Sequence, residues 1–563
     1  MLDLTQAPYF LSQKQVKQVK NMVENMPLEA KIGQLFFIIG PDEANIEEFI
    51  SRYQPGGIMY RPDNALKIID EINSAQNYSK VPLFIAANLE SGGNGLLKEG
   101  TWVGNPLQIA ATDDPSYAFE LGKIGGAEAK QVGGNMAFAP IVDLDLNFRN
   151  PIMNTRTFGS SLQRVLYMSE AETKGFKSQG IIPVIKHFPG DGVDERDQHL
   201  LSSINSLSTT DWNQSYGKIY QQFINQGIPA IMIAHIMQPA WEKKLNPNIK
   251  DQELRPASTS SLLINGLLRQ KLNFQGLAIT DATPMLGYNT AAKRQDLLPM
   301  TINAGIDMIL FNKNIDEDYQ YIRTAIKRGI ITIERVNEAV SRILGTKMAQ
   351  GLLSENKAIT SNSKVNLDFT NHQAIAKVIA KKSVTLVKDR DHLLPLTPEK
   401  YPRLRLVILG DHNDGGFKEG GLVSNLFIQK LKDQRFQVQL FDRKHLDMHE
   451  VFSEGVQDLR AKFDLALYVA NVETASNQTT RRLDWVHLMA ADAPWFLRDI
   501  PTVFVSMANP YHLFDVPDIS TFVNAYTGNP ASITAVIDKL MGREPFNGIS
   551  PIDPFCGDFR AKL

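Results

Sequence analysis

Eight short apolar runs, separated by longer amphipathic stretches, occupy residues 30 to 350 and constrain the fold of this chain most strongly. They read LFFIIG, GGIMY, LFIAANL, NMAFAP, IPVIKHF, AIMIAH, GLAITD and DMILF. Such runs are typical of strands buried on both faces of a parallel sheet, and intervening stretches such as SLLINGLLRQKLN have helical spacing. Eight strand and helix units in one domain predict a (β/α)8 TIM-like barrel, with an open doubly wound sheet as the alternative.

A polar stretch without clear periodicity, residues 351–371, follows the last run and predicts a linker. Six further apolar runs then alternate with helical stretches: SVTLVKD, RLRLVILG, FQVQLF, DLALYVANV, TVFVSMANP and TFVNAY. We therefore predict a barrel over residues 1–350 and a smaller α/β sandwich domain over residues 372–563. The turn GDHNDGG after RLRLVILG lacks the lysine and hydroxyl of a P-loop, which favours an ordinary tight turn over nucleotide binding.

Charge and cysteine content argue against several classes of partner. The 563 residues include 59 basic and 61 acidic ones, and neither sign runs in a block, so no footprint for nucleic acid or an anionic membrane is visible. The single cysteine, Cys556, is expected to be an inert packed thiol. The N-terminus has no apolar core of signal-peptide length, and no stretch is apolar for the roughly 18 residues of a membrane span. We expect a soluble cytoplasmic protein, a monomer or weak homo-oligomer, with a small or neutral ligand.

Ionisable residues end several of the predicted barrel strands. In a barrel of this kind, functional groups gather at the carboxyl ends of the strands. The residues concerned are Lys186, His187, His235 and Asp281, with Asp143 and Asp145 beyond NMAFAP. We expect all of them to face one mouth, although a salt bridge for the lysine and a core position for His187 are the structural alternatives.

The segment KHFPGDGVDERDQHL, residues 186–200, leaves a buried strand and reverses at Pro189 and Gly190. Asp197 and His199 are two residues apart, so in an extended stretch their side chains share one side and can hydrogen-bond. A carboxylate beside an imidazole favours the imidazolium and fixes its tautomer, as a general acid requires. The alternative is a solvated loop without a catalytic role.

Asp281 is followed by small residues in GLAITDATPMLG, which leaves its carboxylate room to face the mouth. A carboxylate there can attack an anomeric carbon, bind a metal or take a proton. A metal is the weakest of these, because only three histidines, His187, His199 and His235, fall in the barrel and none has HxH or HExxH spacing. We expect neither a metal nor a cofactor.

Five motifs, taken in order, resemble the signature series of glycoside hydrolase family 3. They are LEAKIGQLF, APIVDLDLNFRNPIMNTRTFG, KHFPGDG followed four residues later by DQH, AHIMQPA and FQGLAITDA, and their spacing matches over residues 28–311. The later AKKSVTLVKDRDHLLPL and VSMANPYHLFDVP resemble the second domain of that family. A KHFPG loop that carries an Asp, one intervening residue and a His resembles the β-N-acetylglucosaminidase branch.

The resemblance implies a retaining double displacement on a terminal β-linked sugar. Asp281 would be the nucleophile, and His199, paired with Asp197, would protonate the leaving oxygen and later deprotonate a water molecule. The residues that it would place around the sugar are Lys186, His187, Arg156, Asn88, His235 and Asp191.

Two of these residues depart from the family pattern. Asp191 stands where the branch usually reads the second histidine of KHFPGHG. Asn88, in IAANLESGGNG, stands where related barrels have a sugar-binding aspartate. An asparagine still hydrogen-bonds hydroxyls as donor and acceptor, but it lacks the charge that strengthens those bonds, so the sugar specificity stays open.

The leading interpretation is an exo-acting β-N-acetylhexosaminidase that works on cytoplasmic sugars such as cell-wall fragments. A phosphorylase is a close variant, because a histidine acid/base repels anionic phosphate less than a carboxylate would. A β-glucosidase or β-xylosidase would take its acid from the second domain, where Glu473 in NVETASNQTT is the candidate. A non-catalytic sugar-binding protein on the same fold is the alternative of a different class.

Overall fold

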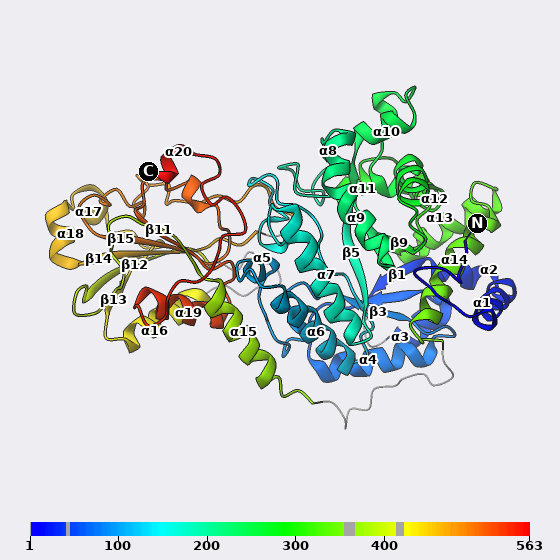
Figure 1. Ribbon diagram of the computed structural model, residues 1–563, viewed down its shortest axis with the longest axis horizontal. Helices are drawn as coiled ribbons and strands as arrows, with labels where there is room; N and C mark the ends of the chain where they lie inside the picture. The colour runs from blue at the N-terminus through cyan, green and yellow to red at the C-terminus, as the bar shows by residue number, and fades with distance from the viewer. Residues whose placement is uncertain (1, 41–44, 354–365, 412–421, 475) are drawn as a thin grey trace.

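The computed structural model describes residues 2–40, 45–353, 366–411, 422–474 and 476–563. Figure 1 shows two bodies of α/β structure, one built from the N-terminal part of the chain and one from the C-terminal part. Helix α14 (Ile333–Ala349) is the last helix of the first body, and α15 (Thr370–Ser383) is the first of the second.

All eight predicted runs of the first body form strands of one sheet. In order of pairing they are β10 (Ile309–Leu310), β1 (Phe36–Ile39), β2 (Gly57–Met59), β3 (Phe84–Ala87), β4 (Met136–Ala137), β5 (Ile182–Phe188), β7 (Ala230–Ile233) and β9 (Leu277–Thr280). Each neighbouring pair is parallel. A parallel bridge between Ile279 and Met308 joins β9 to β10 and closes the ring. The predicted (β/α)8 barrel is confirmed, and the open sheet is wrong.

A side chain helps to close the seam between β9 and β10. The backbone N–H of Thr280 donates to the carbonyl of Met308 at 3.0 Å. The Thr280 hydroxyl accepts from the N–H of Leu310 at 2.8 Å and donates to its carbonyl at 3.3 Å. The hydroxyl therefore supplies pairing to the strand that immediately precedes Asp281.

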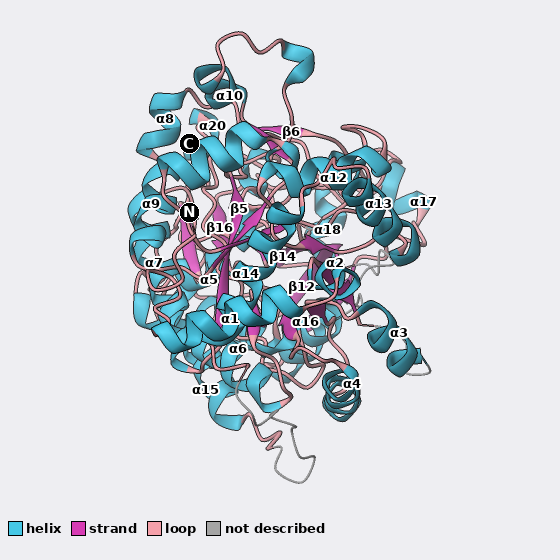
Figure 2. Cartoon of the chain, turned by 90° about the vertical axis from the view of Figure 1, so that its right-hand side faces the viewer, coloured by secondary structure: helices cyan, strands magenta, loops and turns pink. Residues whose placement is uncertain are grey.

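Helices surround this ring, as Figure 2 shows in cyan around the magenta strands. They are α1 (Gln13–Asn25), α2 (Leu28–Gln34), α3 (Ile46–Tyr53), α4 (Ala65–Tyr78), α5 (Pro106–Ala110), α6 (Pro115–Gln131), α7 (Leu162–Ser178), α8 (Thr209–Gln214), α9 (Tyr216–Asn225), α10 (Pro239–Leu245), α11 (Leu286–Asn289), α12 (Arg294–Ala304), α13 (Ile315–Lys327) and α14. The stretch SLLINGLLRQKLN forms a π-type helix, Leu262–Lys271. A short two-stranded sheet pairs β6 (Ser203–Ile204) with β8 (Ile236–Met237).

Local sequence fixes where these helices begin. Helix α6 starts where the side chain of Asp114 accepts the N–H of Ser116 at 2.9 Å and Pro115 occupies the first helical position. Apolar side chains of the helices then pack on the strands. None of the helices in the described ranges is both long and apolar enough to cross a membrane.

The second body is a six-stranded mixed sheet, and each of its six predicted runs forms a strand. The order is β11 (Thr385–Asp389), β16 (Thr521–Asn524), β15 (Thr502–Ser506), β14 (Leu465–Asn471), β12 (Arg403–Gly410) and β13 (Gln437–Leu440), with only β11 antiparallel to its neighbour. Its helices are α15, α16 (Leu422–Asp433), α17 (Met448–Phe452), α18 (Val456–Lys462), α19 (Pro530–Leu540) and α20 (Phe559–Lys562). Two separate apolar clusters flank the sheet, so the predicted α/β sandwich is confirmed.

The stretch predicted as a linker begins directly after α14, and its residues 354–365 lie outside the described residues. Helix α15 begins at Thr370, two residues before the predicted start of the second domain. The Asp368 side chain accepts the N–H of Thr370 at 3.1 Å. Most of the turn GDHNDGG also lies outside the described residues.

The two domains meet in a packed interface near the carboxyl ends of the barrel strands. Leu107 of α5 packs with Tyr511 and Tyr526 of the second domain. The Tyr511 hydroxyl donates to Oδ2 of Asp145 at 2.6 Å, so this strand-end carboxyl faces the second domain. Cys556 lies beside this cluster, where burial raises the pKa of its thiol to about 12 and keeps it protonated.

Candidate active site

The strand-end residues predicted from the sequence gather at the carboxyl ends of the barrel strands. Lys186 and His187 lie in β5, and His235 and Asp281 follow β7 and β9. Asn88 follows β3, and its side chain is exposed. The structure therefore collects these side chains at one mouth, where a parallel barrel places functional groups.

Asp281 is the carboxylate at the centre of this group. Its side chain accepts the N–H of Ala282 at 2.7 Å, and its own N–H donates to the carbonyl of Ile233 at 2.7 Å. The residue is only 9% exposed. Burial acts to raise the pKa of Asp281, but the nearby imidazoles, His187 first, and the Ala282 N–H outweigh burial and lower it. The carboxylate is thus held ionised, as a nucleophile must be.

Asp197 and His199 are in direct contact. Oδ1 of Asp197 accepts both the backbone N–H of His199 at 2.7 Å and the Nδ1 proton of its ring at 2.6 Å. The Asp197 side chain is fully buried, whereas that of His199 is 21% exposed. The carbonyl of His199 accepts the N–H of Leu286, five residues after Asp281, at 3.0 Å. This bond ties the loop of the dyad to the segment that follows the nucleophile candidate.

The second oxygen of Asp197 is bound by the other domain. Oδ2 accepts the backbone N–H of Asn477 at 2.6 Å and that of Gln478 at 3.2 Å. Nothing in the local sequence around Asp197 signals this contact, because the donors lie about 280 residues away. Glu473, the alternative acid, precedes these donors along the chain.

Glu90 organises two cations near Asp281, a role that the sequence reasoning missed. Its carboxylate accepts from Nε and Nη2 of Arg156, both at 2.8 Å, and from Nζ of Lys186 at 2.6 Å. Burial disfavours the charged carboxylate, but Arg156 and Lys186 hold the pKa of Glu90 well below its usual range. Nζ of Lys186 also lies 3.4 Å from Oδ1 of Asn88. The sequence offered one indication of this role, because Glu90 follows Asn88 by two residues just after β3, where functional side chains are expected.

His187 is oriented by a buried carboxylate. Nδ1 of His187 lies 2.7 Å from Oδ2 of Asp143, which also accepts the backbone N–H of His187 at 3.1 Å. Because Asp143 is fully buried and acts as the acceptor, Nδ1 carries the proton and Nε2 is directed away from Asp143. The sequence placed Asp143 at the mouth but did not indicate that it orients His187.

Asp191, the departure from the family loop, is buried beneath the mouth. Its Oδ1 accepts from Nδ2 of Asn150 at 3.0 Å and from the N–H of Gly192 at 2.6 Å, and Oδ2 lies 3.4 Å from Nε2 of Gln198. Burial, together with the charge of Asp143, raises the pKa of Asp191 to about 6. The side chain thus links the KHFPG turn to the residue that precedes His199.

His235 is fully buried and both of its ring nitrogens are occupied. Nε2 lies 3.0 Å from the carbonyl of Ala282, and Nδ1 lies 2.8 Å from the Ser258 hydroxyl. A carbonyl can only accept, so Nε2 carries the proton and Nδ1 accepts from the serine. Burial lowers the pKa of His235 to about 4, which keeps the ring neutral. His235 therefore supports the backbone next to Asp281.

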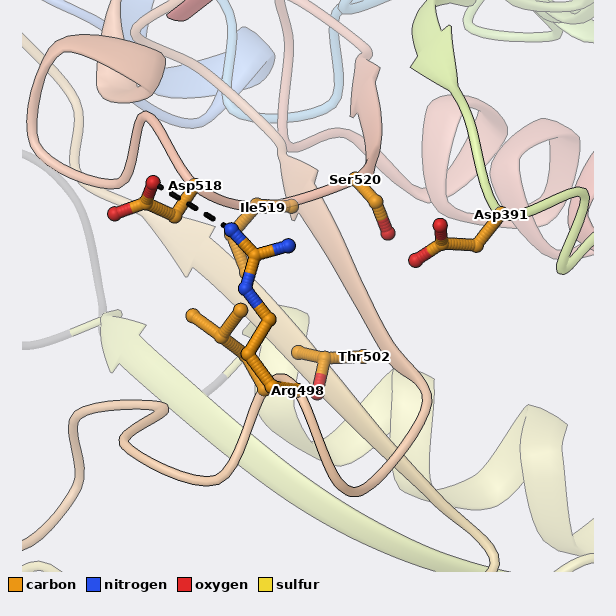
Figure 3. A pocket seen from close by; sticks show the side chains of 7 residues that line it. Asp391, Arg498, Thr502, Asp518, Ile519 and Ser520 are labelled. Atoms are coloured by element: carbon orange, nitrogen blue, oxygen red, sulfur yellow. Dashed lines mark ion pairs between the residues drawn. The ribbon is translucent and has the colours of Figure 1, made fainter. Parts of the chain in front are cut away.

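A separate hollow of about 200 Å³ lies in the second domain (Figure 3). It is lined by Asp391, Leu497, Arg498, Thr502, Asp518, Ile519 and Ser520. The Arg498–Asp518 ion pair spans 3.8 Å and is solvent-exposed, so it contributes little to the stability of the fold. Within the described ranges, moreover, no group of three or more His, Cys, Asp or Glu side chains is arranged to hold a metal ion. The barrel mouth is therefore the stronger candidate site.

Comparisons with known proteins find similarity over the whole chain. A family model, Glycosyl hydrolase family 3 N terminal domain, matches residues 27–346. The chain is 39% identical over 570 residues to the Beta-N-acetylglucosaminidase/beta-glucosidase of Cellulomonas fimi, covering 100% of both proteins. A solved beta-glucoside phosphorylase has a TM-score of 0.92 and 40% identity over 99% of both chains. A solved family 3 beta-N-acetylglucosaminidase from Paenibacillus sp. str. FPU-7 has a TM-score of 0.78 at 22% identity, covers 95% of this chain and 100% of its own, and shows the fold alone.

Proposed function

Because the chain belongs to glycoside hydrolase family 3, we propose that it is a retaining exo-glycosidase that removes a terminal β-linked N-acetylglucosamine or a related β-sugar. The observation that carries the proposal is the pairing of an ionised Asp281 with the Asp197–His199 dyad, whose loop is bonded to the segment after Asp281. A nucleophile and a proton donor at one mouth are the two groups that a double displacement requires.

In the first half-reaction Asp281 attacks the anomeric carbon and forms a covalent glycosyl-enzyme intermediate. His199 donates a proton to the leaving glycosidic oxygen. Asp197 occupies Nδ1 of His199, so the proton leaves from Nε2. The leaving group departs as a neutral alcohol, and Asp281 becomes an ester.

In the second half-reaction the same imidazole, now neutral at Nε2, takes a proton from an incoming water molecule. The water oxygen attacks the anomeric carbon, the bond to Asp281 breaks, and the sugar is released with retained configuration. Asp197 stabilises the imidazolium that forms again, because its carboxylate is 2.6 Å from Nδ1.

The sugar hydroxyls are proposed to contact the cationic group around Glu90. Lys186 and Arg156 donate, and Glu90 fixes both of them in place. Asn88, exposed beside Lys186, offers both a donor and an acceptor without charge. His187, Asp191 and His235 complete the proposed surroundings of the sugar, the last two through the loops that they hold.

Phosphorolysis is a second candidate function. It is favoured by the 40% identity of the chain to a solved beta-glucoside phosphorylase over 99% of both chains. In this version phosphate replaces water as the nucleophile of the second half-reaction, and the product is a sugar 1-phosphate. A histidine acid/base repels that anion less than a carboxylate would.

The barrel, residues 1–350, is proposed as the catalytic domain and residues 351–371 as the linker to residues 372–563. A small carbohydrate, supplied as a cytoplasmic cell-wall fragment, is the proposed substrate.

The test is a panel of 4-nitrophenyl glycosides with β-GlcNAc, β-Glc, β-Xyl and α-linked sugars, assayed with and without inorganic phosphate. Asp281→Ala should abolish turnover, and His199→Ala should lower it by about a hundred- to ten-thousand-fold. Glu195→Ala, on the exposed part of the same loop, is the matched control and should stay near wild type. Azide should restore part of the Asp281→Ala or His199→Ala activity as a glycosyl azide.

Wild-type rates in Asp281→Ala would contradict the mechanism. A sugar 1-phosphate as the main product would replace hydrolysis by phosphorolysis. Activity on the α-linked sugars alone would contradict the proposed stereochemistry of the substrate.

A further inference from the structure

We propose that Asn477 and Gln478 of the second domain are a positioning element for the acid/base dyad: their backbone N–H groups fix the Asp197 carboxylate and, through it, the ring of His199. The inference rests on the proposed role of His199 as the acid/base. It makes proton transfer in the barrel depend on how the second domain docks.

The bonding of the Asp197 carboxylate is divided between the two domains. Oδ1 is used entirely by His199, through the backbone N–H at 2.7 Å and Nδ1 at 2.6 Å. Oδ2 is used by the second domain, through the N–H groups of Asn477 and Gln478. The side chain is fully buried, so the loss of these two donors would remove from Oδ2 the hydrogen bonds that the described residues give it.

The amides are presented by backbone conformation rather than by side chains. Asn477 adopts a positive φ of 65°, a left-handed conformation that Asn and Gly tolerate and β-branched residues avoid. Its side-chain amide donates to the neighbouring Ser476 hydroxyl at 3.3 Å and, among the described residues, makes no hydrogen bond to Asp197 or His199. The Asn477 side chain can therefore be removed without touching the dyad, while its φ cannot be changed without moving the N–H.

The segment after these amides is tied to both domains. The Thr480 hydroxyl donates to the carbonyl of Arg149 in the barrel at 2.9 Å. The carbonyl of Arg481 accepts from Nδ2 of Asn509 at 3.3 Å, and Oδ1 of Asn509 accepts from Nδ2 of Asn154 in the barrel at 3.2 Å. The two N–H groups are thus delivered to Asp197 by a docked interface.

A displaced Asp197 would leave the fold and Asp281 intact but misdirect the proton. The defect should depend on the leaving group, because a good leaving group departs without protonation while a poor one requires it. A general loss of folding or of substrate binding would lower the rates on both kinds of substrate alike. Comparing substrates with good and poor leaving groups therefore distinguishes a misplaced acid/base from a general loss of folding or of substrate binding.

The experiment compares two disruptive variants with two matched controls. Asn477→Val penalises the positive φ, whereas Asn477→Gly removes the same side chain and keeps that φ accessible. Gln478→Pro deletes one of the two N–H groups, whereas Gln478→Ala keeps it. The full-length enzyme is used throughout, and circular dichroism and the melting temperature report on folding.

The measured quantity is kcat/KM for a 2,4-dinitrophenyl and a 4-methoxyphenyl β-glycoside of the sugar that the wild type prefers. Asn477→Val and Gln478→Pro should lose about 10- to 100-fold on the methoxyphenyl substrate, a part of what general acid catalysis contributes, and at most about 3-fold on the dinitrophenyl one. Both controls should retain the wild-type ratio between the two substrates.

Equal losses on both substrates, or no loss in either disruptive variant, would overturn the positioning role. His199→Ala measured alongside keeps the two proposals apart. If His199→Ala itself shows no dependence on the leaving group, the acid/base assignment fails. If His199→Ala shows the dependence and the two disruptive variants do not, only the positioning role fails.

Discussion

The Asp145→Asn substitution should change how stability depends on pH. Asp145 is 3% exposed, its Oδ2 accepts from the Tyr511 hydroxyl, and its Oδ1 has no hydrogen-bond partner in the described part of the chain. Burial raises the pKa of Asp145 from 3.8 to about 7, although the bond from Tyr511 opposes this. The native state therefore keeps a proton that the unfolded chain has already lost.

The direction and the size of this pH effect on stability follow from the linkage between protonation and folding. Between about pH 4 and pH 7 the native state binds one more proton at this site, so its contribution to the unfolding free energy falls as the pH rises. The slope is about 1.4 kcal/mol per pH unit, and the full cost above pH 7 is roughly 4 kcal/mol. Asparagine does not titrate, so the unfolding free energy of Asp145→Asn should lack this pH-dependent contribution. The substitution can also change the unfolding free energy by an amount that is the same at every pH.

Urea denaturation of both proteins from pH 5 to pH 8, followed by tryptophan fluorescence, measures the difference in unfolding free energy. Relative to wild type, Asp145→Asn should become steadily more stable as the pH rises to about 7, and the difference in unfolding free energy should then stay constant. Tyr511→Phe is the control, since it keeps the titrating carboxyl and should keep the slope. Parallel stability curves for wild type and Asp145→Asn would refute the argument.

Three further substitutions test other parts of the site. Gly192→Ala should lower the unfolding free energy by about 1–3 kcal/mol in urea denaturation, because Gly192 has a φ of +95° and an added Cβ would lie 2.0 Å from the carbonyl of Leu144. Glu90→Gln should cost about 3–5 kcal/mol by the same measurement and raise KM, because it leaves the buried Lys186 and the partly exposed Arg156 without their carboxylate. Burial raises the pKa of Asp191 to about 6, so this carboxyl lowers the stability of wild type as the pH rises from about 4 to about 6. The stability of Asp191→Asn should fall less over that range, which a pH series of melting temperatures checks.

The strands and the gathering of strand-end residues were predictable because they rest on local rules. Runs of four to seven apolar residues are typical of strands buried on both faces, and a parallel barrel brings the carboxyl ends of its strands together. Asp281, Lys186 and His187 could be placed at the mouth on that basis alone. Asp197 and His199 could be paired from their spacing of two residues. The extended stretch expected there is instead a turn over residues 198–200, in which Asp197 also accepts the backbone N–H of His199.

The partners of those residues were not predictable, because they depend on which strands become neighbours and how the domains dock. Glu90 meets Lys186 only because β3 and β5 flank β4 in the ring. Asp197 meets Asn477 only because the second domain closes on the barrel. Residue spacing carries no information on contacts of that range.

Replacement of Thr280 by valine would preserve the shape of the side chain and still weaken the ring. Most strand pairs of the barrel are joined by backbone N–H and C=O groups, which do not depend on the identity of the side chain. At the seam between β9 and β10, the Thr280 hydroxyl both accepts from and donates to Leu310. Closure of the barrel therefore depends in part on the side chain of one residue. In Thr280→Val, native-state hydrogen exchange should show that the Leu310 amide loses protection while the amides of β5 keep theirs.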